Sequence, residues 1–275
     1  MSLTITLLVL IGGLSAIIGS IVGIGGGIII VPTMVYLGVE HGLLHNITTQ
    51  VAIGTSSVIL IVTGLSSSLG YLKTKQVDIK NGSIFLFGLL PGSLLGSFIS
   101  RYLTFESFNL YFGIFLIFVA ILLMVRNKIK PFKIFDKPKY EKTYVDAKGK
   151  TYHYSVPPLF AFITTFLIGI LTGLFGIGGG ALMTPLMLIV FRFQPHVAVG
   201  TSMMMIFFSS VMSSIGHIAQ GHVAWGYAII LIISSYFGAK IGVKVNQSIK
   251  SDTVVTLLRT VMLLMGIYLI IRALI

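Results

Sequence analysis

Two copies of one glycine-rich motif are the feature that most limits how this chain can fold. GIGGGIIIVP occupies residues 23–32 and GIGGGALMTP occupies residues 176–185, each inside apolar sequence. Consecutive glycines interrupt a helix, and interrupted backbone is tolerated inside a bilayer only where protein buries it or where it lines a polar cavity. Two interruptions at corresponding places are typical of a transporter with one central site.

Apolar composition identifies the chain as an integral membrane protein. Hydrophobic residues make up 55% and charged residues only 9% of the chain, against about one quarter charged residues in soluble domains. Two apolar runs, 28–39 and 181–191, are too short to cross a bilayer and begin directly after the glycines, so we predict half-helices there. The eight runs close to the ~20 residues of a full span are 3–22, 51–70, 83–100, 108–125, 157–175, 197–218, 223–243 and 253–275.

Basic residues gather in one hydrophilic segment. Nine of the nineteen Lys and Arg residues lie between Arg126 and Lys150. The positive-inside rule places this stretch, residues 126–156, in the cytoplasm as a linker. The net charge of +12 is therefore interpreted as a topology signal, and we expect no nucleic-acid partner. Cysteine is absent, which excludes disulfides and thiolate metal sites.

Further repetition divides the chain into two related halves. The glycine motif recurs 153 residues later, and the segment GTS at 54–56 recurs 146 residues later at 200–202. Repeats of this kind indicate duplicated structural units. We therefore expect a first membrane repeat over residues 1–125 and a second over residues 157–275, joined by the basic linker.

Loop charges indicate that the two halves are inverted. The loop after the first GTS segment carries Lys73, Lys75 and Lys80, its counterpart in the second half has no Lys or Arg, and the bias reverses one loop later. Each half then crosses the membrane an odd number of times, as five spans or as three spans plus a re-entrant hairpin, with both termini outside. The predicted fold is an all-α integral protein of the cell (inner or plasma) membrane, with two inverted repeats and glycine-broken half-helices.

The glycine clusters are the predicted binding site. A helix that starts just after the glycines points free amides and the positive end of its dipole into the membrane interior, where a small oxyanion is the natural ligand. Pro32 and Pro185 fit this start if they lie near the first turn. A packing turn between helices is the alternative interpretation. With the hydroxyls of the GTS segments, the predicted substrate-binding residues are Gly25, Gly26, Gly27, Thr55, Ser56, Gly178, Gly179, Gly180, Thr201 and Ser202.

Tyr71 and His217 occupy matching positions and are secondary candidates, for gating. Each follows a face of small residues, Ser56, Thr63, Ser67 and Gly70 in the first half and Ser202, Ser209, Ser213 and Gly216 in the second. Such faces more often pack membrane helices together than bind ligands. A histidine near a helix end more often lies at the membrane interface than in a functional site.

Enzyme chemistry has no support in the sequence. GIGGGA at 176–181 matches a dinucleotide fingerprint, but no acidic residue from 147 to 251 is present to hold a ribose. Neither glycine run supplies the Gly-Lys-Ser/Thr of a phosphate loop. We predict no enzyme activity, no catalytic residue, no metal and no cofactor, because the acids outside the linker lie at segment edges: Glu40, Asp78, Glu106 and Asp252.

The duplicated GIGGG with its proline, the following GTS segment and GAKIGVKV at 238–245 resemble the sulfite exporter TauE/SafE family, also called toluene sulfonate uptake permeases. The resemblance covers both halves. It implies a bacterial or archaeal inner-membrane carrier of sulfite, sulfonates or related sulfur-containing organic anions, with the glycine clusters and GTS segments as the relevant positions.

These observations predict a transporter in which paired helix N-termini hold a sulfur-containing oxyanion near the midplane while the two halves move to give alternating access. An anion channel that uses the same site is one alternative. A membrane-embedded accessory subunit without transport is another. The expected partners are the small anion and the lipid bilayer, with a homodimer compatible with the sequence.

Overall fold

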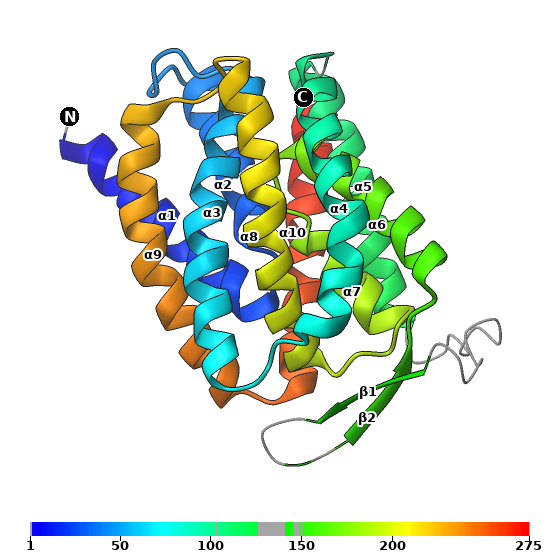
Figure 1. Ribbon diagram of the computed structural model, residues 1–275. Helices are drawn as coiled ribbons and strands as arrows, with labels where there is room; N and C mark the ends of the chain where they lie inside the picture. Colours follow the sequence, from blue (N-terminus) through cyan, green and yellow to red (C-terminus); the bar gives the residue numbers. More distant parts are fainter. Residues whose placement is uncertain (1, 103, 126–140, 146–148, 150, 275) are drawn as a thin grey trace.

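Two successive sets of five helices make up most of the chain (Figure 1). The computed structural model describes residues 2–102, 104–125, 141–145, 149 and 151–274. The first set is α1 (Ser2–Val22), α2 (Gly27–Val35), α3 (Thr49–Lys73), α4 (Ile79–Ile99) and α5 (Phe105–Val125), with a π-helical turn at Tyr36–Glu40 and a 3₁₀ turn at Ser100–Tyr102. The second set is α6 (Pro158–Phe175), α7 (Gly180–Ile189), α8 (Pro195–Ala219), α9 (Trp225–Ser248) and α10 (Ser251–Leu274).

Helix length confirms the predicted division into spans and half-helices. In the described part of the chain, eight helices are long and apolar enough to cross a membrane. The other two, α2 and α7, have 9 and 10 residues, which at about 1.5 Å per residue is roughly half of a hydrocarbon core. The all-α membrane class predicted from composition is therefore confirmed.

The two ends of the bundle carry different parts of the chain. Figure 1 shows both termini at one end and the strands β1 and β2 at the other, and it places the loop after α2 at the end where α1 begins. The pair α1–α2 is therefore a helix hairpin that returns to its starting end, and α3, α4 and α5 then run alternately between the two ends. This order fits an odd number of crossings in the first half; the choice between five spans and three spans plus a re-entrant hairpin, and the inverted relation of the halves, stay predictions.

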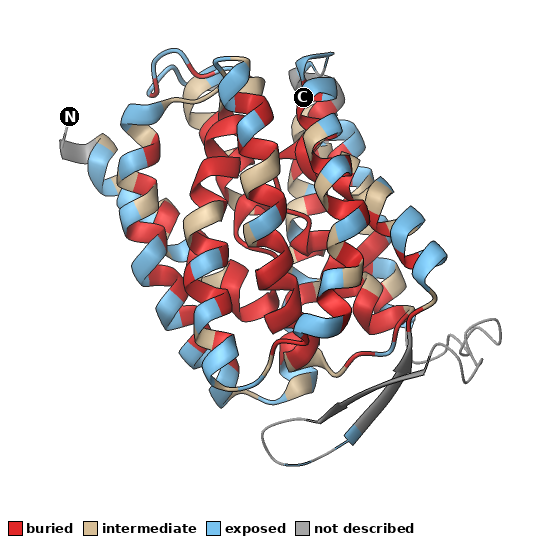
Figure 2. Ribbon diagram, in the orientation of Figure 1, coloured by how far each residue is buried: buried red, intermediate tan, exposed pale blue. Residues whose placement is uncertain are grey.

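Helices of different halves pack against each other. The main pairs are α3 with α8, α1 with α9, α4 with α6 and α5 with α10. Within their apolar windows α3 and α8 are 78% and 72% buried, against 33–44% for the other six spans. Figure 2 accordingly shows buried residues concentrated along the middle of the bundle. The two halves interleave around a central pair of helices, so neither half has a core of its own.

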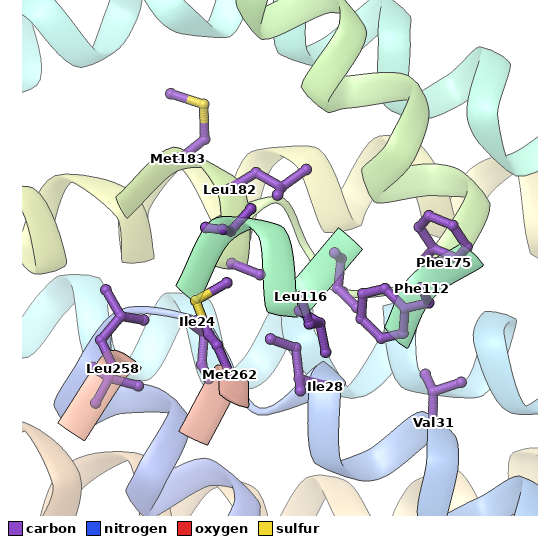
Figure 3. Close-up of a cluster of buried hydrophobic side chains, with 14 of the residues drawn as sticks. Ile24, Ile28, Val31, Phe112, Leu116, Phe175, Leu182, Met183, Leu258 and Met262 are labelled. Carbon is purple, nitrogen blue, oxygen red and sulfur yellow. The ribbon is translucent and has the colours of Figure 1, made fainter. Parts of the chain in front are cut away.

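The half-helices lie inside the bundle and have an apolar shell. Side chains from α2, α7 and the glycine turn before α2 meet others from α5, α6 and α10 (Figure 3). Phe112 of α5 stacks on Phe175 of α6 with ring centroids 4.8 Å apart. Burial on all sides explains why α2 and α7 show no polar face: they are supported by packing and not by solvent.

A two-stranded hairpin lies in the predicted linker. β1 (Glu141–Val145) pairs antiparallel with β2 (Thr151–Ser155), with Glu141 opposite Ser155. Thr, Tyr and Val, which favour extended backbone, fill these strands. The sequence analysis did not predict these strands. Residues 126–140, 146–148 and 150, which carry eight of the nine basic residues of the linker, lie outside the described residues.

Candidate binding site at the glycine turns

Both short helices begin at a left-handed glycine turn. Gly25 and Gly26 have φ of +79° and +90°, and Gly178 and Gly179 have φ of +67° and +73°. Residues with a Cβ atom rarely adopt this conformation. α2 and α7 start at Gly27 and Gly180, so the helix N-termini follow the glycines as predicted to within one residue.

The prolines of the two motifs lie deeper in the helices than predicted. Pro32 and Pro185 are each the sixth residue of their helix, inside it and not in its first turn. A proline there has no amide to donate to the carbonyl four residues earlier and leaves it without its helical donor. The expectation that they lie near the first turn, where an amide donor is dispensable, is wrong: the sixth residue of a helix lies beyond the first four free amides, so an amide there would have a helical acceptor.

The two glycine turns touch each other at the centre of the bundle. A Cβ atom added to Gly27 would lie 2.8 Å from the carbonyl oxygen of Gly176, and one added to Gly180 would lie 2.5 Å from the carbonyl oxygen of Gly23. Backbone of one half therefore packs directly on backbone of the other. The structure brings together the six glycines predicted as site residues, Gly25, Gly26, Gly27, Gly178, Gly179 and Gly180.

Two apolar side chains fill the space over the glycines. Leu60 of α3 and Ile206 of α8 are fully buried and occupy matching positions, 146 residues apart. A Cβ atom at Gly25 would lie 3.0 Å from Leu60 Cδ2, and one at Gly178 would lie 2.8 Å from Ile206 Cγ2. Sequence analysis missed this pair, since an aliphatic residue in a membrane helix carries no distinguishing signal. In this conformation the glycines are closed off by side chains.

Serines of the GTS segments connect the two halves reciprocally. Ser56 of α3 donates to the carbonyl oxygen of Gly176 at 2.9 Å, and Ser202 of α8 donates to that of Gly23 at 2.8 Å. Thr184 of α7 also donates to Gly23, at 2.8 Å. A serine hydroxyl has one proton to donate. Both predicted donors are therefore engaged with backbone of the opposite half in this conformation.

The threonines of the GTS segments hold the ends of neighbouring helices. Thr55 Oγ1 accepts from the amide of Ala224 and Thr201 Oγ1 accepts from the amide of Asp78, each at 2.9 Å. Ala224 and Asp78 immediately precede α9 and α4. The structure thus gives Thr55 and Thr201 a structural contact, and their binding role stays a prediction.

Glycine at the first position of each GTS segment allows a loop to cross the helix closely. Cβ atoms at Gly54 and Gly200 would meet the carbonyl oxygens of His222 and Gln76. The same two loops contain the amides that Thr55 and Thr201 accept from, so glycine and threonine act together. Each residue of the GTS segment thus has a contact in the structure. The glycine and the threonine hold a neighbouring loop, and the serine bonds the glycine turn of the opposite half.

Tyr71 and His217 are buried and hydrogen-bonded at matching places. Tyr71 Oη donates to the carbonyl oxygen of Ser20 at 2.8 Å, and His217 Nε2 lies 3.0 Å from the carbonyl oxygen of Gly173. Both side chains are fully buried. α8 ends two residues past His217, so this side chain is buried in protein near a helix end, and its depth in the membrane stays a prediction.

One of the carboxylates at the segment edges is buried. Asp78 is 5% exposed and caps α4: Oδ1 accepts from the amide of Asn81 at 3.1 Å and Oδ2 accepts from its side-chain amide at 2.6 Å. An aspartate just before an apolar run is a typical N-cap, so the sequence could have predicted this role.

Asn246 is a second residue that the sequence analysis missed. It is fully buried, and it donates to the carbonyl oxygen of Ile21 at 2.6 Å, next to the first glycine turn. Among the described residues no group of three or more His, Asp or Glu side chains is placed to hold a metal ion.

Comparison with known proteins gives consistent results over nearly the whole chain. The chain is 42% identical over 268 residues to a probable membrane transporter protein, YunE, of Bacillus subtilis, covering 98% of each chain. It is 25% identical to a probable membrane transporter protein of Methanocaldococcus jannaschii, over 98% of this chain and 96% of that one. Over 90 residues, 33% of this chain and 19% of the relative, it is 38% identical to sulfite exporter TauE/SafE family protein 2 of Arabidopsis thaliana.

No solved structure matches the chain significantly. The family model described as sulfite exporter TauE/SafE matches residues 8–269, which include both glycine turns and both GTS segments. This protein therefore belongs to the sulfite exporter TauE/SafE family of membrane transporters.

Proposed function

We propose that this transporter moves small sulfur-containing oxyanions, such as sulfite or sulfonates, by alternating access around the two glycine turns. The observation that supports this most is the contact of the turns themselves. One helix N-terminus from each half, that of α2 and that of α7, begins at the buried centre where the two backbones meet. Amides and helix dipoles that converge there favour a negative ligand. The preference for sulfur oxyanions follows from the family.

Opening of the site requires exchange of the contacts that now close it. Ser56 and Ser202 donate to carbonyl oxygens of the opposite half, and Leu60 and Ile206 lie over the glycines. When the halves separate, the same hydroxyls become available to the oxygen atoms of an anion. In the closed state the hydroxyls of Ser56 and Ser202 donate to backbone carbonyl oxygens. In the bound state the same hydroxyls donate to the substrate, so they keep an acceptor in both states.

The proposed binding set is accordingly the six glycines with Ser56 and Ser202, and Thr55 and Thr201 position the neighbouring helices. No described residue is assigned a catalytic role. Sulfite efflux from proteoliposomes reconstituted with purified protein tests the proposal, with taurine, sulfoacetate and thiosulfate added in turn as competitors. We expect saturable flux that at least one competitor reduces. Flux no greater than in empty liposomes would refute sulfite transport, and flux without saturable counterflow would favour a channel.

A matched pair of variants tests the site within the same assay. Ser56→Ala removes a donor at the glycine turn, whereas Ser57→Ala changes the neighbouring buried serine, which pairs with Ser213 across the helix interface at 3.2 Å. We expect a large loss of sulfite flux in the first variant and near-normal flux in the second. Equal flux in both would remove Ser56 from the binding set. An accessory subunit would show no flux to lose.

A further inference from the structure

Four buried polar atoms along one face of α8 and its C-cap residue have no hydrogen-bond partner among the described residues. They are Oγ of Ser210, Oγ of Ser214, Nδ1 of His217 and Oε1 of Gln220. Ser210 and His217 are fully buried and Ser214 is 2% exposed. Spacings of four, three and three residues place all four on one side of a helix. Buried polar groups are nearly always satisfied in native proteins, so such a row points to bound water or a ligand.

This face leads from the glycine turn to one end of the bundle. Ser210 Oγ lies 3.1 Å from the position of a Cβ atom at Gly178, so the face begins at the proposed site. At its far end Gln220 Nε2 donates to the carbonyl oxygen of Ser97 of α4 at 3.0 Å. α8 ends at Ala219, and the loop 220–224 that follows lies at the end of the bundle that also carries the termini (Figure 1).

The row contains both donors and acceptors. A carbonyl oxygen only accepts, so His217 Nε2 carries the hydrogen that bonds Gly173, and Nδ1 of the neutral ring is a bare acceptor. Gln220 Oε1 is an acceptor as well, whereas the two serine hydroxyls donate or accept. Acceptors repel a naked anion but bind water, so an anion that passes them moves with water between.

The matching face of the first half is satisfied internally. The positions 146 residues earlier are Gly64, Ser68, Tyr71 and Thr74. Ser68 donates to the carbonyl oxygen of Leu65 at 3.1 Å, Tyr71 to that of Ser20 at 2.8 Å and Thr74 to that of Tyr71 at 3.2 Å. Gly64 has no side chain. The two halves therefore differ at these four matched positions.

We propose that this face of α8 is a hydrated access route by which the anion passes between the glycine turns and the 220–224 end of the bundle, and that the matching face of α3 is closed. The identity of the passing anion rests on the proposed function; the route does not. Serine hydroxyls donate to anion oxygens along the inner part, and water bridges to His217 and Gln220 along the outer part.

The absence of cysteine allows a direct test with single-cysteine variants. Ser214→Cys lies on the route and Ser68→Cys is its matched control on α3. In purified protein in nanodiscs, an anionic water-soluble methanethiosulfonate should modify S214C at least about tenfold faster than S68C, because the labelling rate follows the population of hydrated states. Sulfoacetate, which unlike sulfite does not react with the thiosulfonate reagent, should slow the S214C reaction. Equal rates, or no reaction at either position, would overturn the proposed route.

A second variant closes the route with a residue that the fold already accommodates. His217→Tyr places at this position the residue of the first half, where Tyr71 reaches the carbonyl oxygen of Ser20. We expect slower labelling of S214C in the H217Y background, with an unchanged size-exclusion profile. Unchanged labelling would contradict the route. Fast S214C labelling without any sulfite flux would instead refute the substrate and leave the route supported.

Discussion

Gly26 is held by two constraints, a positive φ and a close backbone neighbour, whereas Gly221 has only the positive φ. Both have positive φ, +90° and +71°, but a Cβ atom at Gly26 would lie 2.6 Å from the carbonyl oxygen of Ser15, whereas nothing lies within 4 Å of one at Gly221. Gly221→Ala should cost about 1–2 kcal/mol for the left-handed backbone alone. Gly26→Ala should cost more, visible as a larger drop in the midpoint of thermal unfolding in detergent. Equal drops would mean that α1 yields freely to the added methyl group.

The two GTS serines should differ in their effect on stability. Ser56 and Ser202 make equivalent bonds, but Thr184 also donates to the carbonyl oxygen of Gly23. Ser202→Ala therefore leaves that oxygen with a partner, whereas Ser56→Ala removes the one side-chain donor to the carbonyl oxygen of Gly176 found among the described residues. We expect about 1 kcal/mol of destabilisation for S56A and less for S202A, measured by thermal unfolding. The reverse order would contradict the assigned bonds.

At the residue scale the sequence predicted the glycines but not their contacts. Positive φ and helix starts follow from local composition, and duplication pointed to both turns. The bond from Ser56 to Gly176 joins residues 120 positions apart, and it depends on how α3 packs against the second half. Leu60 and Ile206, which close the site, look like any aliphatic residue of a span.

The 220–224 loop carries a histidine whose charge weakens the fold. Burial lowers the pKa of His222 below 6.5, so the unfolded chain binds this proton more readily than the folded one. Its contribution to stability is full above about pH 6.5 and is lost as the pH falls through the folded pKa. The midpoint of thermal unfolding should therefore fall more between pH 8 and pH 5 in the native protein than in His222→Gln. Parallel pH profiles would show that the ring is freely hydrated.

At the scale of helices, run length and charge were sufficient for most of the fold. Eight spans and two half-helices were predicted because a hydrocarbon core sets helix length, and α2 and α7 are short because of the glycines before them. The hairpin β1–β2 was not predicted, since its polar strands lie within a basic segment that reads as a linker. The sequence also did not predict that α1 packs on α9 and α4 on α6. The apolar faces of the spans have similar composition, so the sequence does not show which helix packs on which.

Orientation in the membrane is a property of the whole molecule. Lys73, Lys75 and Lys80 lie at the end of the bundle opposite both termini, and the positive-inside rule predicts that this end faces the cytoplasm. Lys75 and His41 are exposed at opposite ends. In intact cells a membrane-impermeant maleimide should label His41→Cys and spare Lys75→Cys until the cells are broken. The opposite pattern would invert the assigned topology.

The interleaving of the halves also has a consequence for the order of synthesis. The hydroxyls that bind the carbonyl oxygen of Gly23 belong to Thr184 and Ser202, 161 and 179 residues further along the chain. A nascent first half that has entered the bilayer therefore lacks the hydroxyl donors to the Gly23 carbonyl oxygen until α7 and α8 have been translated and inserted. Completion of the first glycine turn therefore follows synthesis of the second one, and a chain that stalls before α7 has neither of the hydroxyls that bind the Gly23 carbonyl oxygen.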